Sequence, residues 1–128
     1  MKTSHNQFLK LAFNIAETNL GKTKLNPSVG CVVVKNNSVI SSACTSNNGR
    51  PHAEFNALNF KKDFKNSDLY LTMEPCTHKG LTPPCTNLII KKKIKRVFFA
   101  FYDLDHRTAR KSKKKLAPYK IKTIKKNS

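Results

Sequence analysis

The chain has 128 residues, of which 38% are hydrophobic, so it is long enough for one domain with a buried core. Its formal net charge is +18, and no apolar run approaches the roughly 18 residues of a membrane helix. Because the N-terminal residues also lack the apolar stretch of a signal peptide, we expect a single domain over residues 1–128, located in the cytoplasm without a membrane partner.

Hydrophobic spacing predicts the secondary structure in chain order. A first helix with one broad apolar face begins near Phe8 and ends near Gly21. A hairpin follows, and then strands alternate with helices. The expected later elements are the strand pair 29–34 and 38–43, a helix over 52–60, a strand over 68–73, a helix from 83 to about 93, a strand over 97–101, a helix over 109–116 and a strand over 119–124.

This order predicts an α/β fold. Helices between the later strands imply parallel crossovers, whereas the first two strands form an antiparallel hairpin. We therefore expect a three-layer α/β/α domain around a mixed, about five-stranded sheet. Pro83 and Pro84 are predicted to occupy the first turn of their helix, where proline loses no needed amide bond.

The positive charge is concentrated at the C-terminal end. Residues 91–128 contain 15 Lys or Arg and only two acidic residues, and the stretch from about 110 to 128 is especially rich in lysine. A solvated surface is the favoured interpretation, with nucleic-acid binding as the alternative. A basic field would also attract a small phosphorylated substrate.

Three residues form a candidate metal site. His52 opens one predicted helix, Cys76 follows a strand, and Cys85 starts the next helix. Zinc binds Cys and His tetrahedrally, and three protein ligands leave a fourth position for water, as in catalytic sites. Four cysteines in a cytoplasmic chain are also more typical of free or metal-bound thiols than of disulfides. We therefore predict that His52, Cys76 and Cys85 bind Zn²⁺.

Glu54 is the candidate catalytic residue. It lies two positions after His52, a spacing that lets its carboxylate approach the metal-bound water rather than the metal. Zinc deaminases combine H-x-E with P-C-x-x-C and use the Glu to shuttle protons. Here the second cysteine comes after eight residues instead of two. The other cysteines fit simpler roles, Cys31 in the core and Cys44 at a strand end, and His5 and His106 are predicted to lie on the surface.

Three stretches resemble the deaminase half of the bifunctional riboflavin-biosynthesis deaminase/reductase. They are NPSVGCVVV at 26–34, GRPHAEFNAL at 49–58 and LTMEPCTHKGLTPPCTNLI at 71–89. The resemblance covers about residues 6–116. It implies a cytidine-deaminase-like fold and a zinc-dependent hydrolase. The implied reaction converts 2,5-diamino-6-ribosylamino-4(3H)-pyrimidinone 5′-phosphate into 5-amino-6-ribosylamino-uracil 5′-phosphate and ammonia.

The same resemblance implies substrate contacts from Asn26, which would face the pyrimidine, and from His78 in the loop between the cysteines. The family usually has Lys or Arg where this chain has Leu81, and Lys79 is a candidate replacement. It often has His where Thr45 stands, and Thr45 can still form a hydrogen bond. Its D-P-N-P motif is here replaced by Asp103-Leu104-Asp105-His106, which changes one wall of the expected pocket.

The partners implied are a phosphorylated pyrimidine, further copies of the chain in a homo-oligomer, and a separate reductase, because no reductase half is present in these 128 residues. Two other functions stay open. One is a zinc deaminase of another nucleobase or nucleoside. The other is an inactive zinc-stabilised module that binds RNA or a protein through its basic end, although such a module would not need Glu54.

Overall fold

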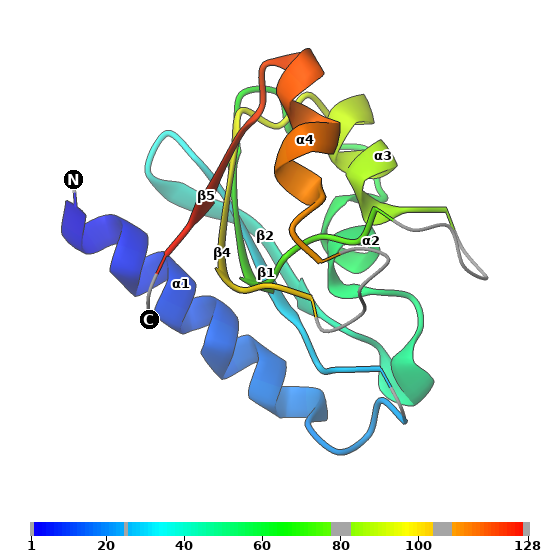
Figure 1. Cartoon of the computed structure of the whole chain (residues 1–128). Helices are drawn as coiled ribbons and strands as arrows, with labels where there is room; N and C mark the ends of the chain where they lie inside the picture. Colours follow the sequence, from blue (N-terminus) through cyan, green and yellow to red (C-terminus); the bar gives the residue numbers. More distant parts are fainter. Residues whose placement is uncertain (1, 25, 78–82, 104–108, 127–128) are drawn as a thin grey trace.

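The fold was analysed in a computed structural model, which describes residues 2–24, 26–77, 83–103 and 109–126. A central sheet of five strands has helices on both faces (Figure 1). The strands are β1 (Gly30–Lys35), β2 (Ser38–Cys44), β3 (Asp68–Met73), β4 (Arg96–Phe101) and β5 (Lys122–Lys125). The helices are α1 (Lys2–Ala16), α2 (Ala53–Leu58), α3 (Cys85–Lys91) and α4 (Ser112–Leu116), with 3-10 turns at Glu17–Asn19, Asn47–Gly49 and Ala117–Tyr119.

The strand order is β2-β1-β3-β4-β5. Strand β1 is antiparallel to both β2 and β3, while β3, β4 and β5 run parallel to one another. The mixed five-stranded sheet and the three-layer arrangement are therefore as predicted. In the described residues, no helix has the length and apolar content needed to cross a bilayer.

The sheet separates two hydrophobic cores because successive strand residues point to opposite faces. Val32 and Tyr70 pack with Leu9 and Ala12 under α1. Cys31 and its neighbours on the other face pack against α2, α3 and α4. Cys31 is fully buried, which confirms its prediction as a core residue. The second core supports the two helices whose first residues were predicted to carry metal ligands.

Several predicted boundaries were wrong. Helix α1 begins at Lys2 rather than near Phe8, because polar residues continue the helix beyond its apolar pattern. Helix α2 stops at Leu58, since Asn59 leaves helical geometry (φ −86°, ψ 58°). Pro83 and Pro84 precede α3 instead of forming its first turn, and Pro84 is an extended N-cap residue (φ −58°, ψ 141°). The ring of Pro84 disfavours helical geometry in the preceding residue, Pro83.

The C-terminal elements are also shifted. Helix α4 covers only Ser112–Leu116, and β5 starts at Lys122 because Lys120 adopts a left-handed conformation (φ 62°) that turns the chain. His5, predicted as a surface residue, is half-buried rather than fully exposed. Its ring stacks on Phe98 with centroids 4.5 Å apart, and its Nδ1 lies 2.5 Å from the Tyr70 hydroxyl. His106 lies outside the described residues.

Gly30 determines how closely α1 packs on the sheet. A Cβ atom at this position would lie 1.8 Å from the carbonyl oxygen of Ala12 and 2.7 Å from its carbonyl carbon. Both neighbours belong to a helix backbone, which cannot move aside without displacing α1. We expect Gly30→Ala to lower the free energy of unfolding by about 3 kcal/mol or more, measured by urea denaturation.

Gly21→Ala is the matched control for this prediction. Nothing lies within 4 Å of the Cβ that it would add, so only its positive φ of 82° opposes the change. Its cost should be about 1 kcal/mol, the usual cost of left-handed backbone in a residue with a Cβ. Equal effects of the two substitutions would contradict the close packing of α1 on Gly30.

Candidate metal and catalytic site

The site forms where two helix starts meet the end of a strand. His52 is the extended N-cap residue of α2 (φ −70°, ψ 164°), and Cys85 is the first residue of α3. Cys76 follows the end of β3. The buried side chain of Glu54 lies in the first turn of α2, which is next to the ligand-bearing end of that helix. The structure thus brings together all four residues that were predicted to carry the chemistry.

The geometry of the three candidate ligands fits a tetrahedral zinc ion. The Nδ1 atom of His52 lies 3.5 Å from the sulfur of Cys85 and 3.9 Å from that of Cys76. All three ligand atoms lie within 4.8 Å of one another. With zinc bonded to nitrogen and sulfur at its usual distances, a tetrahedral site separates such atoms by roughly 3.6 Å. The triad therefore has the spacing that zinc requires.

The protonation of the cluster also fits a cation. A hydrogen bond from the Cys85 thiol is the main cause that lowers the pKa of Cys76 to about 4, and the Cys85 amide supports it from 3.0 Å. The Cys85 pKa is raised, first by that same hydrogen bond and then by burial and the charge of Glu54. Without a cation the cluster thus favours only one thiolate, and a divalent cation would allow both cysteines to ionise.

Glu54 and His52 respond to the same surroundings. Burial is the main cause that raises the pKa of Glu54 to about 7, and the charge of Cys76 adds to the effect. The hydrogen bond with Cys76 raises the pKa of His52, while burial and the positive charge of Arg50 oppose that rise. The protonation states of these acidic and basic groups therefore depend on one another, as is common at catalytic sites.

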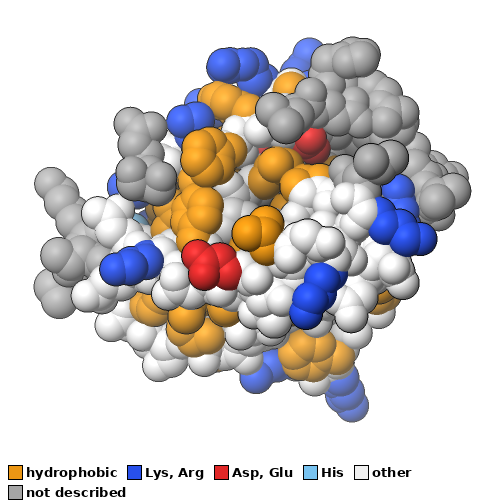
Figure 2. Space-filling view, turned by 90° about the horizontal axis from the view of Figure 1, so that it is seen from below, with side chains coloured by type: hydrophobic (Ala, Val, Ile, Leu, Met, Phe, Trp, Pro, Cys, Tyr) orange, Lys and Arg blue, Asp and Glu red, His pale blue; other side chains and the backbone are white. Residues whose placement is uncertain are grey.

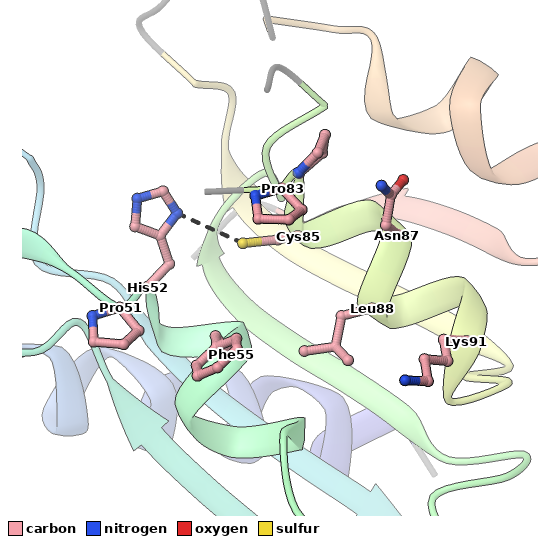
Figure 3. Close-up of a pocket in the computed structure, with 9 residues that line it drawn as sticks. Pro51, His52, Phe55, Pro83, Cys85, Asn87, Leu88 and Lys91 are labelled. Atoms are coloured by element: carbon pink, nitrogen blue, oxygen red, sulfur yellow. Dashed lines mark hydrogen bonds between the residues drawn. The ribbon is translucent and has the colours of Figure 1, made fainter. Parts of the chain in front are cut away.

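A pocket opens beside the triad, between α2 and α3 (Figure 3). It has a volume of about 280 Å³. His52 and Cys85 border it on the metal side, and Phe55 and Leu88 form its apolar wall. Asn87 and Lys91 of α3 supply polar groups at its edge. A small molecule could therefore reach the ligand cluster from this side.

Two predicted substrate residues make backbone contacts. Asn26 is half-buried, and its side-chain amide donates to the carbonyl of Gly49 at 2.9 Å, close to the start of α2. Thr45 is only 1% exposed. Its hydroxyl accepts a hydrogen bond from the Val29 amide and donates to the Pro27 carbonyl. A substrate contact by Thr45 stays a prediction that these contacts do not favour. His78, Lys79 and Leu81 lie outside the described residues.

The sequence had suggested no role for Glu74, which the structure places two residues before Cys76. Its carboxylate is 3% exposed and accepts hydrogen bonds from the amides of Asp103, Arg110 and Ser112 and from the Ser112 hydroxyl. Glu74 thereby attaches the segment between β4 and α4 to the strand end that carries Cys76. An acidic residue that directly follows a buried strand was the available signal for such a role.

The fold and the His/Cys/Cys cluster beside a buried Glu are typical of cytidine-deaminase-like proteins. Residues 2–101 match the family model described as the cytidine and deoxycytidylate deaminase zinc-binding region. The chain belongs to this family.

Individual relatives agree with this assignment. A riboflavin biosynthesis protein RibD from Aquifex aeolicus is 45% identical over 97 residues, which are 75% of this chain and 27% of the relative. A diaminohydroxyphosphoribosylamino-pyrimidine deaminase from Buchnera aphidicola is 39% identical, over 75% of this chain and 66% of that protein. The chain thus spans about a quarter of the length of the RibD relatives that it matches.

A solved structure from Thermotoga maritima shares the fold. It is a diaminohydroxyphosphoribosylaminopyrimidine deaminase/5-amino-6-(5-phosphoribosylamino)uracil reductase with a TM-score of 0.88 and 34% sequence identity. The match covers 96% of this chain and 36% of the other. The cytidine-deaminase-like fold that the resemblance implied is therefore confirmed.

The triad predicts which thiols bind metal. Cys76→Ala should abolish stoichiometric zinc binding, because two ligands cannot complete the site. Cys44→Ala, which removes a half-buried thiol outside the triad, should retain one zinc per chain. Metal analysis after dialysis against a mild chelator measures both. Retention of zinc by Cys76→Ala, or its loss from Cys44→Ala, would contradict the ligand assignment.

Proposed function

We propose that this chain catalyses the zinc-dependent hydrolytic deamination of 2,5-diamino-6-ribosylamino-4(3H)-pyrimidinone 5′-phosphate in riboflavin biosynthesis. The products would be 5-amino-6-ribosylamino-uracil 5′-phosphate and ammonia. The observation that carries the proposal is the buried Glu54 beside the His52, Cys76 and Cys85 cluster. The relatives named for riboflavin biosynthesis and for this deaminase reaction support the choice of substrate.

In this mechanism, His52, Cys76 and Cys85 would hold zinc, which when bound supplies the Lewis acidity that makes water a nucleophile at neutral pH. Glu54 accepts a proton from the attacking water. A carbon–oxygen bond then forms at the ring carbon that bears the exocyclic amine. Glu54 delivers protons to the ring nitrogen and to the departing nitrogen, the carbon–nitrogen bond breaks, and ammonia leaves. Burial of Glu54 keeps these transfers away from bulk water.

Further residues complete the proposed substrate site. Asn26 is proposed to contact the pyrimidine, supported by its hydrogen bond to the loop that leads into His52. His78 and Lys79 are proposed to contribute from the loop between the two cysteines. The pocket beside His52 and Cys85 supports access by a small molecule. A homo-oligomeric enzyme located in the cytoplasm is also part of the proposal.

A substrate panel tests the proposal. We expect zinc-loaded protein to release ammonia from the diamino-pyrimidinone phosphate and to leave cytidine, guanine and adenosine unchanged under the same conditions. The reason is that relatives such as those from Aquifex aeolicus and Buchnera aphidicola are named for riboflavin biosynthesis or for this deaminase reaction. Turnover of another compound in the panel would instead identify the chain as a deaminase of that compound. Absence of turnover in protein with full zinc content would favour an inactive binding module.

Glu54→Gln tests the proton transfers. The amide matches the carboxylate in size, so the substitution should leave the zinc content and the fold unchanged. It cannot accept and deliver protons, and the rate of ammonia release should fall by about 10²–10⁴-fold or more. Glu17→Gln is the matched control, because Glu17 is exposed in the turn after α1 and should retain full activity. Substantial activity in zinc-loaded Glu54→Gln would exclude Glu54 as the proton shuttle.

A further inference from the structure

The proposed substrate carries a phosphate monoester, and this inference rests on that proposed function. A dianion of this kind is bound best by a nearby cation with several hydrogen-bond donors. The catalytic cluster offers no cation for this phosphate. His52, Cys76 and Cys85 are the proposed metal ligands, and Glu54 is the proposed proton shuttle. Thr45 has a buried hydroxyl with two backbone partners, and Leu81 is apolar. A basic residue for the phosphate must therefore come from elsewhere.

Two loops next to the site are held together by backbone contacts. The amide of Asn48 donates to the Lys22 carbonyl at 2.8 Å, and the Asn26 side chain donates to the Gly49 carbonyl at 2.9 Å. Gly49 has a φ of 89°, and a Cβ atom there would lie 2.6 Å from the carbonyl oxygen of Thr23. These contacts join the described parts of residues 20–28 to residues 45–52 in one wall that leads directly to His52.

This wall is cationic. No acidic residue occurs in the sequence between Glu17 and Glu54, whereas Lys22, Lys24 and Arg50 all lie on the two loops. Figure 2, which looks onto the lower end of Figure 1, shows Lys and Arg side chains at several points around this face of the molecule and apolar side chains at its centre. A phosphate that approaches this wall meets an attractive field.

Arg50 is distinguished from the two lysines by its position. Lys22 and Lys24 are exposed, whereas Arg50 is half-buried and lies two residues before His52. Because Arg50 is only two residues from His52, its positive charge lies close to the ligand cluster, where it opposes the rise in the pKa of His52. Hydrogen bonds fix the backbone on both sides of Arg50. The Asn26 side chain donates to the carbonyl of Gly49, and the Ser46 amide donates to the carbonyl of Pro51 at 3.1 Å. The planar guanidinium fork matches two phosphate oxygens.

We propose that Arg50 binds the phosphate group of the substrate and thereby makes this site specific for a phosphorylated pyrimidine over its nucleoside. Arg50 acts in binding, so its contribution should appear in KM and not in kcat. Two other cations compete for this role. Lys79, which lies outside the described residues, is the candidate from the sequence, and Lys91 lines the pocket beside His52 and Cys85.

The test compares zinc-loaded wild-type chain with Arg50→Met, Arg50→Lys, Lys79→Met, Lys91→Met and Lys10→Met. Initial rates of ammonia release are measured with the diamino-pyrimidinone phosphate and with its dephosphorylated form. We expect Arg50→Met to raise KM for the phosphorylated compound roughly 10- to 100-fold, with kcat within about 3-fold, and to leave the dephosphorylated compound unaffected. Arg50→Lys should lose less, since it keeps the charge, and the control Lys10→Met, which changes an exposed lysine of α1 outside the two loops, should match the wild type.

Direct binding of ribose 5-phosphate, measured by calorimetry, separates this inference from the proposed function. If the wild type deaminates no compound yet binds ribose 5-phosphate in an Arg50-dependent manner, the reaction is wrong and the phosphate site stands. If the wild type deaminates the phosphorylated substrate but Arg50→Met and Arg50→Lys discriminate against the dephosphorylated form as fully as the wild type does, the phosphate site is overturned. Loss of phosphate discrimination in Lys79→Met alone, or in Lys91→Met alone, would likewise overturn it in favour of that lysine.

Discussion

The coupling of three acidic side chains in one buried region is the constraint on which the rest of the site depends. Cys76, Cys85 and Glu54 cannot all be anionic there without a positive charge between them. The fold meets this condition by directing the starts of α2 and α3 to the end of β3, so that an imidazole and two sulfurs face one point. The hydrophobic core under these helices holds that arrangement, because Ala57 and Ile89 are fully buried against the sheet.

The strand end is held from a second side by Glu74. Among the described residues between β4 and the start of α4, its buried carboxylate accepts hydrogen bonds from the amides of Asp103 and Arg110 and from both the amide and the hydroxyl of Ser112. This interaction explains why α4 starts at Ser112 rather than at Ala109, since the carboxylate engages the Ser112 amide at the helix start. The position of Cys76 is therefore tied both to α3, through the Cys85 amide, and to the edge of the parallel strands.

The strands and the cluster of His52, Cys76 and Cys85 could be predicted from the sequence because their signals are local. Runs such as 29–34 and 97–101 are apolar enough to specify buried strands, and H-x-E with P-C is typical of zinc deaminases. The missed features depend on residues distant in the chain. His5 is half-buried against Phe98 and Tyr70, and the Thr45 hydroxyl is bound by the backbone at 27–29. No local pattern reports such partners.

The division between regular elements and loops has a consequence for the chemistry. The metal ligands and Glu54 lie at or next to the ends of α2, α3 and β3, where packing of the core limits substitution. Asn26 and Arg50, which are proposed to recognise the substrate, lie on loops, where a change of side chain costs little stability. Because the proposed deamination depends on the residues at the element ends, we expect the differences from the resembling family at positions 45 and 81 to leave that step intact. The proposed phosphate contact of Arg50 likewise assigns recognition of the substrate to a loop and the chemistry to the ends of helices and strands.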